Sequence, residues 1–339
     1  MEEWIKAIGR GKKGSRDLSY SEARTAAEAF ANEQWTDVQA GAFFSLMRMK
    51  EATGAELQAF AEVFREHTQV LPLPSPNGLD CAGPFDGRHR FAATIPAAFV
   101  SAAAGLPVTL QGSRTLPPKY GTPLEVILEA CGIDPAQTQD GCAVTYVNLE
   151  TRCAPLKKLR HVREQLGVRT FINTIEKTLC PTQGNTLLLG AFHKTAIERM
   201  TPMLQTLPYE KVIVFQGDEG SEDLPVDRTA SFAYVITSAE VRQLTFRLDE
   251  TGVSKQTISK EPITAEQQAS ITEQILGGKK NADIQPYREQ VVYNAGIRHF
   301  LLNRVSSVTA GIDEARRLLD DGEPYRLFSN LKRKKEVVG

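Results

Sequence analysis

The sequence contains no apolar run near the length of a membrane-spanning helix. Such a helix needs about 20 consecutive apolar residues, and charged residues interrupt every apolar run well before that length. The first 17 residues, MEEWIKAIGRGKKGSRD, are charged and have no apolar core typical of a secretory signal. We therefore expect no membrane partner and a location in the cytoplasm.

Cysteine is sparse and badly spaced for metal binding or disulfides. The chain has five cysteines, an odd number, and no CxxC pair. The five histidines show no metal-ligand spacing, and neither a GxSxG nucleophile motif nor a P-loop occurs. These absences argue against a zinc site, a disulfide framework and Ser/His/Asp hydrolysis. Reduced, mostly buried thiols fit a reducing compartment.

Net charge is also low, at −1, which by itself argues against a polyanionic partner. The charges are nevertheless segregated along the chain. Residues 152–177 hold seven basic and two acidic side chains, while acids gather in GDEGSED at 217–223. A near-neutral chain with segregated charge can present one basic face, or it can simply have solvated charged helices.

The first part of the chain predicts a small helical bundle. Helices are expected over 19–33, 36–51 and 53–67. Ser19 followed by Glu22 is a capping-box pattern at the start of the first helix, and short connections between helices favour packed neighbours. The second helix places four apolar residues on one face: Val38, Ala42, Leu46 and Met49.

Proline then interrupts the helical pattern, and strands begin to alternate with helices. LPLPSPNG at 71–78 is typical of a linker, because three prolines exclude helix and strand interiors. Apolar strand-like runs follow at 79–83, 107–113, 141–149, 186–192, 211–217 and 231–238. The alternation predicts an α/β fold with a mostly parallel sheet. We expect a helical domain over 1–75, with a helical return segment at about 155–185, and an α/β domain over 76–339.

Several segments together resemble the anthranilate phosphoribosyltransferase family of glycosyl transferases. They are GAFFSLMRMK, AAFVSAAAGLPV, GVRTFIN, LLLGAFH and YNAGIRHFLLNRVSSVTAGIDEARRLLDDG, in family order over nearly the whole chain. The resemblance implies the class III nucleoside phosphorylase and phosphoribosyltransferase fold, in which a small helical domain, often the dimer contact, and a larger α/β domain enclose a cleft. It also implies phosphoribosyl pyrophosphate and Mg²⁺ as ligands, and a homodimer formed through the helical domain.

The loop that binds phosphate in this family is altered here. The family's Gly-rich GTGGD loop lets backbone N–H groups approach a phosphate closely, but residues 81–86 read CAGPFD and keep only Gly83. Pro84 lacks an N–H donor, and Phe85 fills space. The family's Asn-x-Ser-Thr keeps a single hydroxyl, on Thr94. We interpret this as a degraded phosphate-binding loop.

Other family positions are partly preserved. The family's KHGN becomes residues 110–113, LQGS, so its lysine is replaced by leucine, while Gly112 and Ser113 stay candidate phosphate contacts. The resemblance assigns phosphate-side roles to Arg114 and Lys119, and an anthranilate contact to Arg163. It also assigns Mg²⁺ to the adjacent acids Glu222 and Asp223. Such a pair is a plausible hard-cation site, and equally a solvated acidic turn.

FDGRHR at 85–90 resembles a paralogous branch of the family that lacks detectable transferase chemistry and includes nucleic-acid binding without sequence preference. Arginines beside a helix N-terminus attract anions, so a phosphodiester backbone could cross the cleft. We expect phosphate or nucleic-acid contacts from Gly83, Gly87, Arg88, His89, Arg90, Thr94, Gly112, Ser113, Arg114, Lys119, Lys157, Lys158, Arg160 and Arg163.

Three hypotheses stay open on the sequence. The first is a non-enzymatic nucleic-acid binder that uses no cofactor. The second is a phosphoribosyltransferase with an altered acceptor, in which Thr94 and Arg88 hold the pyrophosphate group and Glu222 and Asp223 hold Mg²⁺. The third is a dimeric scaffold with no ligand in the cleft. The sequence decides neither DNA against RNA, nor the acceptor, the pathway or any remaining transferase activity.

Overall fold

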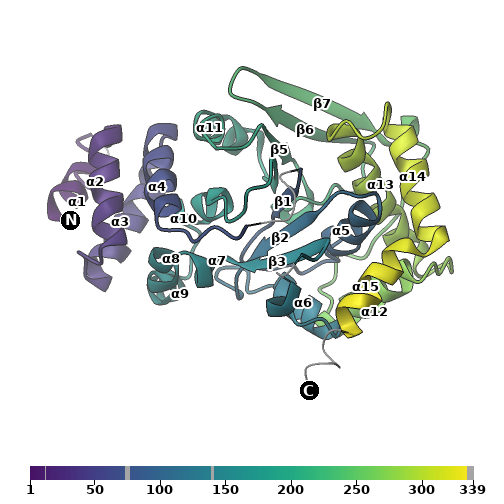
Figure 1. The fold of residues 1–339 in the computed structure, drawn as a ribbon. Coiled ribbons are helices and arrows are strands. Elements are labelled where there is room, and N and C mark those ends of the chain that lie inside the picture. Colours follow the sequence, from purple (N-terminus) through teal and green to yellow (C-terminus); the bar gives the residue numbers. More distant parts are fainter. Residues whose placement is uncertain (12, 73–76, 139–140, 334–339) are drawn as a thin grey trace.

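Four helices form the N-terminal bundle in the computed structural model, which describes residues 1–11, 13–72, 77–138 and 141–333 (Figure 1). They are α1 (Glu2–Ile8), α2 (Tyr20–Ala31), α3 (Asp37–Lys50) and α4 (Gly54–Glu66). The predicted capping box of Ser19 and Glu22 is confirmed, and Thr36 and Thr53 begin α3 and α4 in the same way. These caps satisfy N–H groups that the first helical turn leaves free. Helix α1 was not predicted.

The predicted apolar face of α3 proved not to be the buried one. Val38 and Met49 are each 81% exposed, whereas Phe43, Phe44 and Met47 are fully buried. The two phenylalanine rings pack against Phe30 of α2. Aromatic rings bury the largest apolar area, so they determine which side of a helix with apolar residues all round faces the core.

Four short helices from the middle of the chain return to the bundle. They are α7 (Leu149–Arg152), α8 (Ala154–Lys158), α9 (Arg160–Leu166) and α10 (Ile172–Ile175). α8 contacts α2, α9 contacts α3 and α10 contacts α4. Phe171 fixes this return segment, because its ring packs edge-on against Phe44 and Phe60.

A seven-stranded sheet forms the centre of the larger part, in the order β3-β2-β1-β4-β5-β6-β7. Its strands are β1 (Leu79–Ala82), β2 (Val108–Gly112), β3 (Val144–Asn148), β4 (Thr186–Gly190), β5 (Lys211–Phe215), β6 (Ala230–Ile236) and β7 (Val241–Arg247). The pairs among β1 to β5 are parallel, and β6 and β7 are antiparallel additions. The predicted α/β class with a mostly parallel sheet is confirmed.

Helices cover both faces of the sheet. One face carries α5 (Thr94–Ala103), α6 (Leu124–Ala130), α12 (Ala265–Leu276), α13 (Gln285–Leu301), α14 (Val308–Asp321) and α15 (Glu323–Arg333). The other carries α11 (Lys194–Leu204) and the return helices, which join the sheet to the bundle (Figure 1). Strand residues alternate accordingly: Leu188 belongs to the first core, Leu187 and Leu189 to the second.

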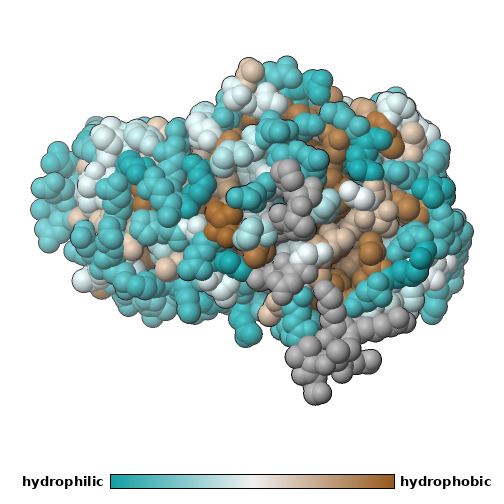
Figure 2. Space-filling view, in the orientation of Figure 1, coloured by the Kyte–Doolittle hydropathy of each residue, from teal (hydrophilic) through white to brown (hydrophobic). Residues whose placement is uncertain are grey.

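Surface hydropathy follows this layering. In Figure 2 the face over the bundle is mostly hydrophilic, while apolar residues gather over the α/β part and its junction with the bundle. No helix in the described ranges is long and apolar enough to cross a membrane. The predicted domain boundary after residue 75 falls within 73–76, outside the described residues, and stays a prediction.

Candidate functional site

The carboxyl ends of four parallel strands bring several of the predicted site residues to one edge of the sheet. β1 ends at Ala82, β2 at Gly112, β4 at Gly190 and β5 at Phe215. The loops that follow these strands therefore lie together, which is where ligands bind in open parallel α/β sheets.

Two glycines fix the loop after β1. Gly87 has φ +83°, and a Cβ there would lie 2.1 Å from the carbonyl oxygen of Gly121. Next to this contact, the Arg88 N–H donates to the Thr122 carbonyl at 2.8 Å, and the Thr122 N–H donates back to the Arg88 carbonyl at 2.8 Å. The backbone of Arg88 is thus clamped, and its side chain is directed into the protein.

The Arg88 side chain ends in a closed group of charges. Its guanidinium lies 2.8 Å from Glu222 and 2.9 Å from Asp223. On the other side, Arg298 of α13 lies 3.2 Å from Asp223 and donates to the Glu222 carbonyl at 3.0 Å. All four side chains are at most 3% exposed. We call Arg88, Glu222, Asp223 and Arg298 the buried ion cluster; its two positive and two negative charges balance.

Burial and charge act against each other in this cluster. Burial raises the pKa of Asp223 to about 6, although Arg88 favours its ionised form. Burial also disfavours the charged form of Arg88, but the carboxylates of Glu222 and Asp223 outweigh it, so the Arg88 pKa is raised. The arginines therefore hold the acids in a buried, paired state, not in a solvated turn.

The predicted anion site at the start of α5 is also occupied by a side chain of the protein itself. α5 begins at Thr94, as expected near Ala93, and the Thr94 backbone N–H donates to Asp223. The Thr94 hydroxyl accepts a hydrogen bond from Arg298 at 3.3 Å. The carboxylate of Asp223 therefore occupies the helix N-terminus that was expected to attract a phosphate.

The space beside Gly83 is likewise taken. A Cβ at Gly83 would lie 2.6 Å from Glu222 Oε2 and 2.9 Å from Arg88 Nη2. The single glycine left in the altered loop thus makes room for the buried ion cluster. This arrangement does not fit Mg²⁺, because two guanidinium groups already neutralise both carboxylates at close range. No group of three or more His, Cys, Asp or Glu side chains in the described ranges is placed to hold a metal ion.

A second layer of ion pairs surrounds the cluster. Arg90 lies 2.5 Å from Asp218, and Lys119 lies 2.7 Å from Glu219. Glu219 also accepts the backbone N–H groups of His89 and Arg90. Burial opposes ionisation of Glu219, but its contact with Lys119 outweighs this and lowers the Glu219 pKa. Burial lowers the pKa of Lys119.

The expectation that the basic residues face an open cleft is therefore wrong for Arg88 and Arg163. Arg163 is 3% exposed and lies 2.6 Å from the buried Glu176. Burial raises the pKa of Glu176, against the effect of Arg163. Both guanidinium groups lie in the interior and pair with internal acids, so neither lines an open cleft.

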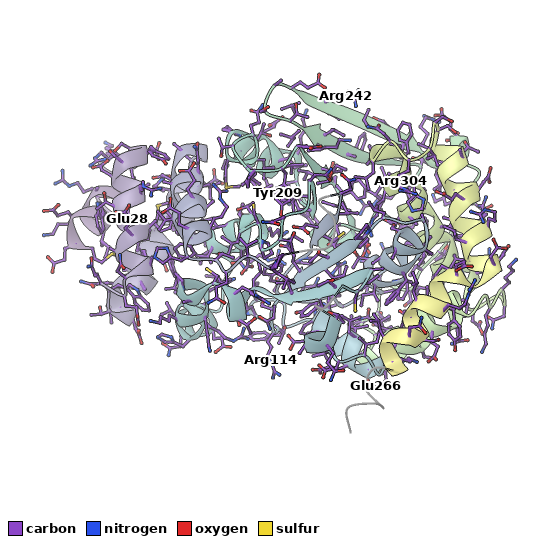
Figure 3. All side chains as sticks on the ribbon, in the orientation of Figure 1. Glu28, Arg114, Tyr209, Arg242, Glu266 and Arg304 are labelled. Atoms are coloured by element: carbon purple, nitrogen blue, oxygen red, sulfur yellow. The ribbon has the colours of Figure 1, made fainter. Side chains whose placement is uncertain are left out.

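Other predicted residues lie on the outside of the loops and helices. Arg114 and Lys157 are exposed, and neither side chain makes an ion pair with another described residue. Lys158 pairs with Glu33, and Arg160 pairs with Glu150 at 2.7 Å. Figure 3 shows Arg114 extending from the edge of the molecule. Arg160 donates to the carbonyl of Arg114 at 3.4 Å, so the two residues adjoin.

Gly112 and Ser113 serve the backbone at the end of β2. A Cβ at Gly112 would lie 2.9 Å from the Tyr146 hydroxyl, so glycine allows β3 to pack closely. The buried Ser113 hydroxyl donates to the Arg114 carbonyl at 3.0 Å.

A cavity of about 200 Å³ opens beside these loops. Its walls include Phe85, Arg169, Asn173, Lys177 and Phe192. The Lys177 ammonium donates to the Gly190 carbonyl at 2.9 Å, and burial lowers its pKa to about 8. The guanidinium of Arg169 lies 2.5 Å from the buried Asp86.

Sequence reasoning missed three side chains of this region: Arg169, Lys177 and Arg298. The first two were counted as basic residues, but no pattern placed them on a cavity. Arg298 had a usable signal, because it stands in the interior of a helix whose neighbours are apolar, YNAGIRHFLL. A charge in such a position needs a buried partner.

Comparisons with known proteins agree with this architecture. Residues 82–325 match the model of the glycosyl transferase family, a/b domain, and residues 2–68 match that of the glycosyl transferase family, helical bundle domain. An anthranilate phosphoribosyltransferase of Methanocorpusculum labreanum is 28% identical over 93% of both chains. One of Exiguobacterium sibiricum is 27% identical over 95% of this chain and 96% of the relative.

Solved structures share the fold. The crystal structure of the enzyme TrpD from Thermus thermophilus, at 22% identity, superposes with a TM-score of 0.80 over 98% of this chain and 99% of the other. The enzyme from Saccharomyces cerevisiae in complex with PRPP and Mg, at 17% identity, gives 0.82 over 97% and 96%.

Proposed function

This chain belongs to the glycosyl transferase family. We propose that it binds the phosphate backbone of nucleic acid. We also propose that it is not a transferase that uses phosphoribosyl pyrophosphate (PRPP). The observation that carries the proposal is the buried ion cluster. Arg88 and Arg298 pair with the two acids that the family resemblance assigns to Mg²⁺.

Interaction energies favour the buried ion cluster over a binding site for PRPP and Mg²⁺. Removing one partner from a buried ion pair costs about 3–5 kcal/mol, and Mg²⁺ with a pyrophosphate group would have to displace Arg88 from two carboxylates. Charge-assisted hydrogen bonds to phosphate contribute about 1.5–3 kcal/mol each. The altered loop has few donors left to make them, because Pro84 has no N–H and Leu110 carries no charge.

Nucleic acid is expected to bind outside the cluster, on four cations of the loop after β2 and of the return helices α8 and α9. We call them the rim cations: Arg114, Lys157, Lys158 and Arg160. Arg114 and Lys157 are exposed without an acidic partner among the described residues. Lys158 and Glu33 are both about half exposed, and surface pairs of this kind are worth only about 0–1 kcal/mol. A phosphate group can therefore displace the acid. Arg160 supports the group, although it is held more firmly by Glu150.

The rim cations predict contact with phosphates and not with base edges, so binding is independent of sequence. Each phosphate neutralised on duplex DNA lowers log K by about 0.9 per tenfold rise in salt concentration. Four contacts predict a slope of about −3 to −4. A DNA and an RNA duplex of equal length should bind within about tenfold of each other, because both present the same charged backbone.

An electrophoretic shift assay with a random duplex at 50 and 200 mM salt tests the proposal. The double variant Arg114→Glu and Lys157→Glu should weaken binding at least tenfold at 50 mM salt and reduce the salt slope by about 2. A matched control, Lys255→Glu and Lys260→Glu, changes the charge equally at two exposed lysines elsewhere. Equal weakening by both variants, or no binding by the wild type at 50 mM salt, would refute it.

A second candidate function is favoured by the relatives. They carry the name anthranilate phosphoribosyltransferase, and one of similar fold is in complex with PRPP and Mg. In that function Thr94 and Arg88 hold the pyrophosphate group, and Glu222 and Asp223 hold Mg²⁺ after Arg88 has moved. Release of pyrophosphate from PRPP in the presence of Mg²⁺ and anthranilate tests it. Turnover that Thr94→Val abolishes would support this candidate over the first.

We also propose a homodimer formed through the helical bundle. The exposed apolar side of α3, with Val38 and Met49 each 81% exposed, supports it. Light scattering should give twice the mass of one chain, and Val38→Asp with Met49→Asp should give a monomer. A wild-type monomer at 50 µM would contradict the proposal. The cytoplasm remains the proposed location, and the cysteines of the described residues form no disulfide.

A further inference from the structure

Lys177 differs from Lys50 and Lys119, which are also largely buried, because it has no carboxylate partner among the described residues. Lys50 lies 2.5 Å from Glu56, and Lys119 lies 2.7 Å from Glu219. Lys177 lies in the short 3-10 helix Glu176–Thr178, and its amine makes one hydrogen bond, to the Gly190 carbonyl at 2.9 Å. No acid among the described residues comes within 4 Å of this amine.

The acids nearest to Lys177 are already committed to arginines. Asp86 pairs with Arg169, Glu176 with Arg163, and Glu222 with Arg88. Their charges raise the pKa of Lys177, and Arg169 lowers it. These effects do not offset the burial, because a buried ammonium needs paired charge or several acceptors. The neutral amine needs fewer partners.

Lys177 also borders a space that a ligand can occupy. Lys177 lines the cavity of about 200 Å³, together with the rings of Phe85 and Phe192 and the amide of Asn173. At about 30 Å³ for each water molecule, this volume corresponds to about seven waters, or a ligand with a single small ring. The other charged groups in the walls are paired, so the cavity favours a ligand without net charge.

We propose that Lys177 is a covalent site for small uncharged aldehydes, which it binds as an imine. The nitrogen lone pair of the neutral amine forms a bond to the carbonyl carbon, and one N–H proton moves to the carbonyl oxygen. The resulting carbinolamine loses its hydroxyl group with the second N–H proton as water, leaving the C=N bond. No redox partner is needed. This activity goes beyond backbone binding and does not depend on it.

Benzaldehyde is a suitable probe, with borohydride reduction to trap the imine and peptide mass spectrometry to locate it on the wild-type protein. An amine with a pKa of about 8 is about one-quarter neutral at pH 7.5, whereas an ordinary lysine is about 0.1% neutral. Lys177 should therefore be labelled on the order of 100-fold more than the exposed Lys255 and Lys260. Labelling should rise with a midpoint near pH 8.

An aldehyde too large for the cavity is the control for binding inside it. The larger 1-naphthaldehyde should label the exposed lysines as benzaldehyde does but label Lys177 at least tenfold less. Lys177→Arg should remove the preferred site, and the wild-type measurement stands even if that variant folds poorly. Labelling of Lys177 no faster than Lys255, a midpoint near pH 10, or equal labelling by both aldehydes would each overturn the proposal.

Discussion

Replacing Arg88 by methionine removes a positive charge from the buried ion cluster and keeps a side chain of similar length. Glu222 then loses its only ion pair among the described residues, while Asp223 keeps Arg298 at 3.2 Å. Breaking a buried pair on one side costs about 3–5 kcal/mol, a large part of the 5–15 kcal/mol typical of total stability. Denaturant unfolding at pH 7.5 should show this loss.

Lower pH and Mg²⁺ should each restore part of the stability that Arg88→Met loses. Without Arg88 the folded pKa of Asp223 rises further above the unfolded value, so this variant loses stability as pH rises above about 4 and is closest to wild type near pH 4. The unpaired acids also become a hard-cation site. Mg²⁺ at 100 times its Kd would restore about 2.7 kcal/mol, while the wild type should not respond.

Arg90→Met is the matched control for this prediction. The pair of Arg90 with Asp218 is partly exposed, so its loss should cost about 1 kcal/mol or less and create no response to Mg²⁺. The reasoning is refuted if Arg88→Met costs no more than Arg90→Met, or if Mg²⁺ stabilises the wild type as much as the Arg88 variant.

Two further predictions concern stability. Gly83→Ala should lower the free energy of unfolding in urea by about 1–3 kcal/mol, because the new Cβ would lie 2.6 Å from Glu222 Oε2. Gly41→Ala, in the interior of α3 where a Cβ has room, should instead raise it by about 0.5–1 kcal/mol. A change in the same direction for both variants would contradict the account. The pKa of Lys177 is lowered to about 8, so the folded protein binds fewer protons than the unfolded chain above that pH. Stability relative to Lys177→Met should therefore rise from pH 8 to pH 10, and a flat difference would show an unperturbed lysine.

Most of the fold could be predicted because the signals were local. The capping box at Ser19 and the apolar runs of β1 to β6 each define an element within a few residues. β7 was missed because most of its residues are exposed and polar, which leaves no apolar run to detect. The face of α3 was predicted wrongly because its apolar residues surround the helix, and only tertiary packing of Phe43 and Phe44 decides which side is buried.

The site was harder to predict because its contacts are distant in sequence. Arg88 and Asp223 are 135 residues apart, and nothing local shows that the basic stretch 88–90 faces the acidic stretch 217–223. Each stretch alone is typical of a ligand-binding loop. Paired across the sheet edge, they neutralise each other, so a count of basic residues overestimates the charge available to a ligand.

Calorimetric titration of the wild-type protein with PRPP in the presence of Mg²⁺ tests the central claim most directly, since the buried ion cluster leaves no room for this ligand beside Gly83. The account predicts no saturable heat at millimolar PRPP, with or without Mg²⁺. Saturable binding that requires Mg²⁺ and is lost in Asp223→Asn would contradict it and show that the cluster opens to the donor.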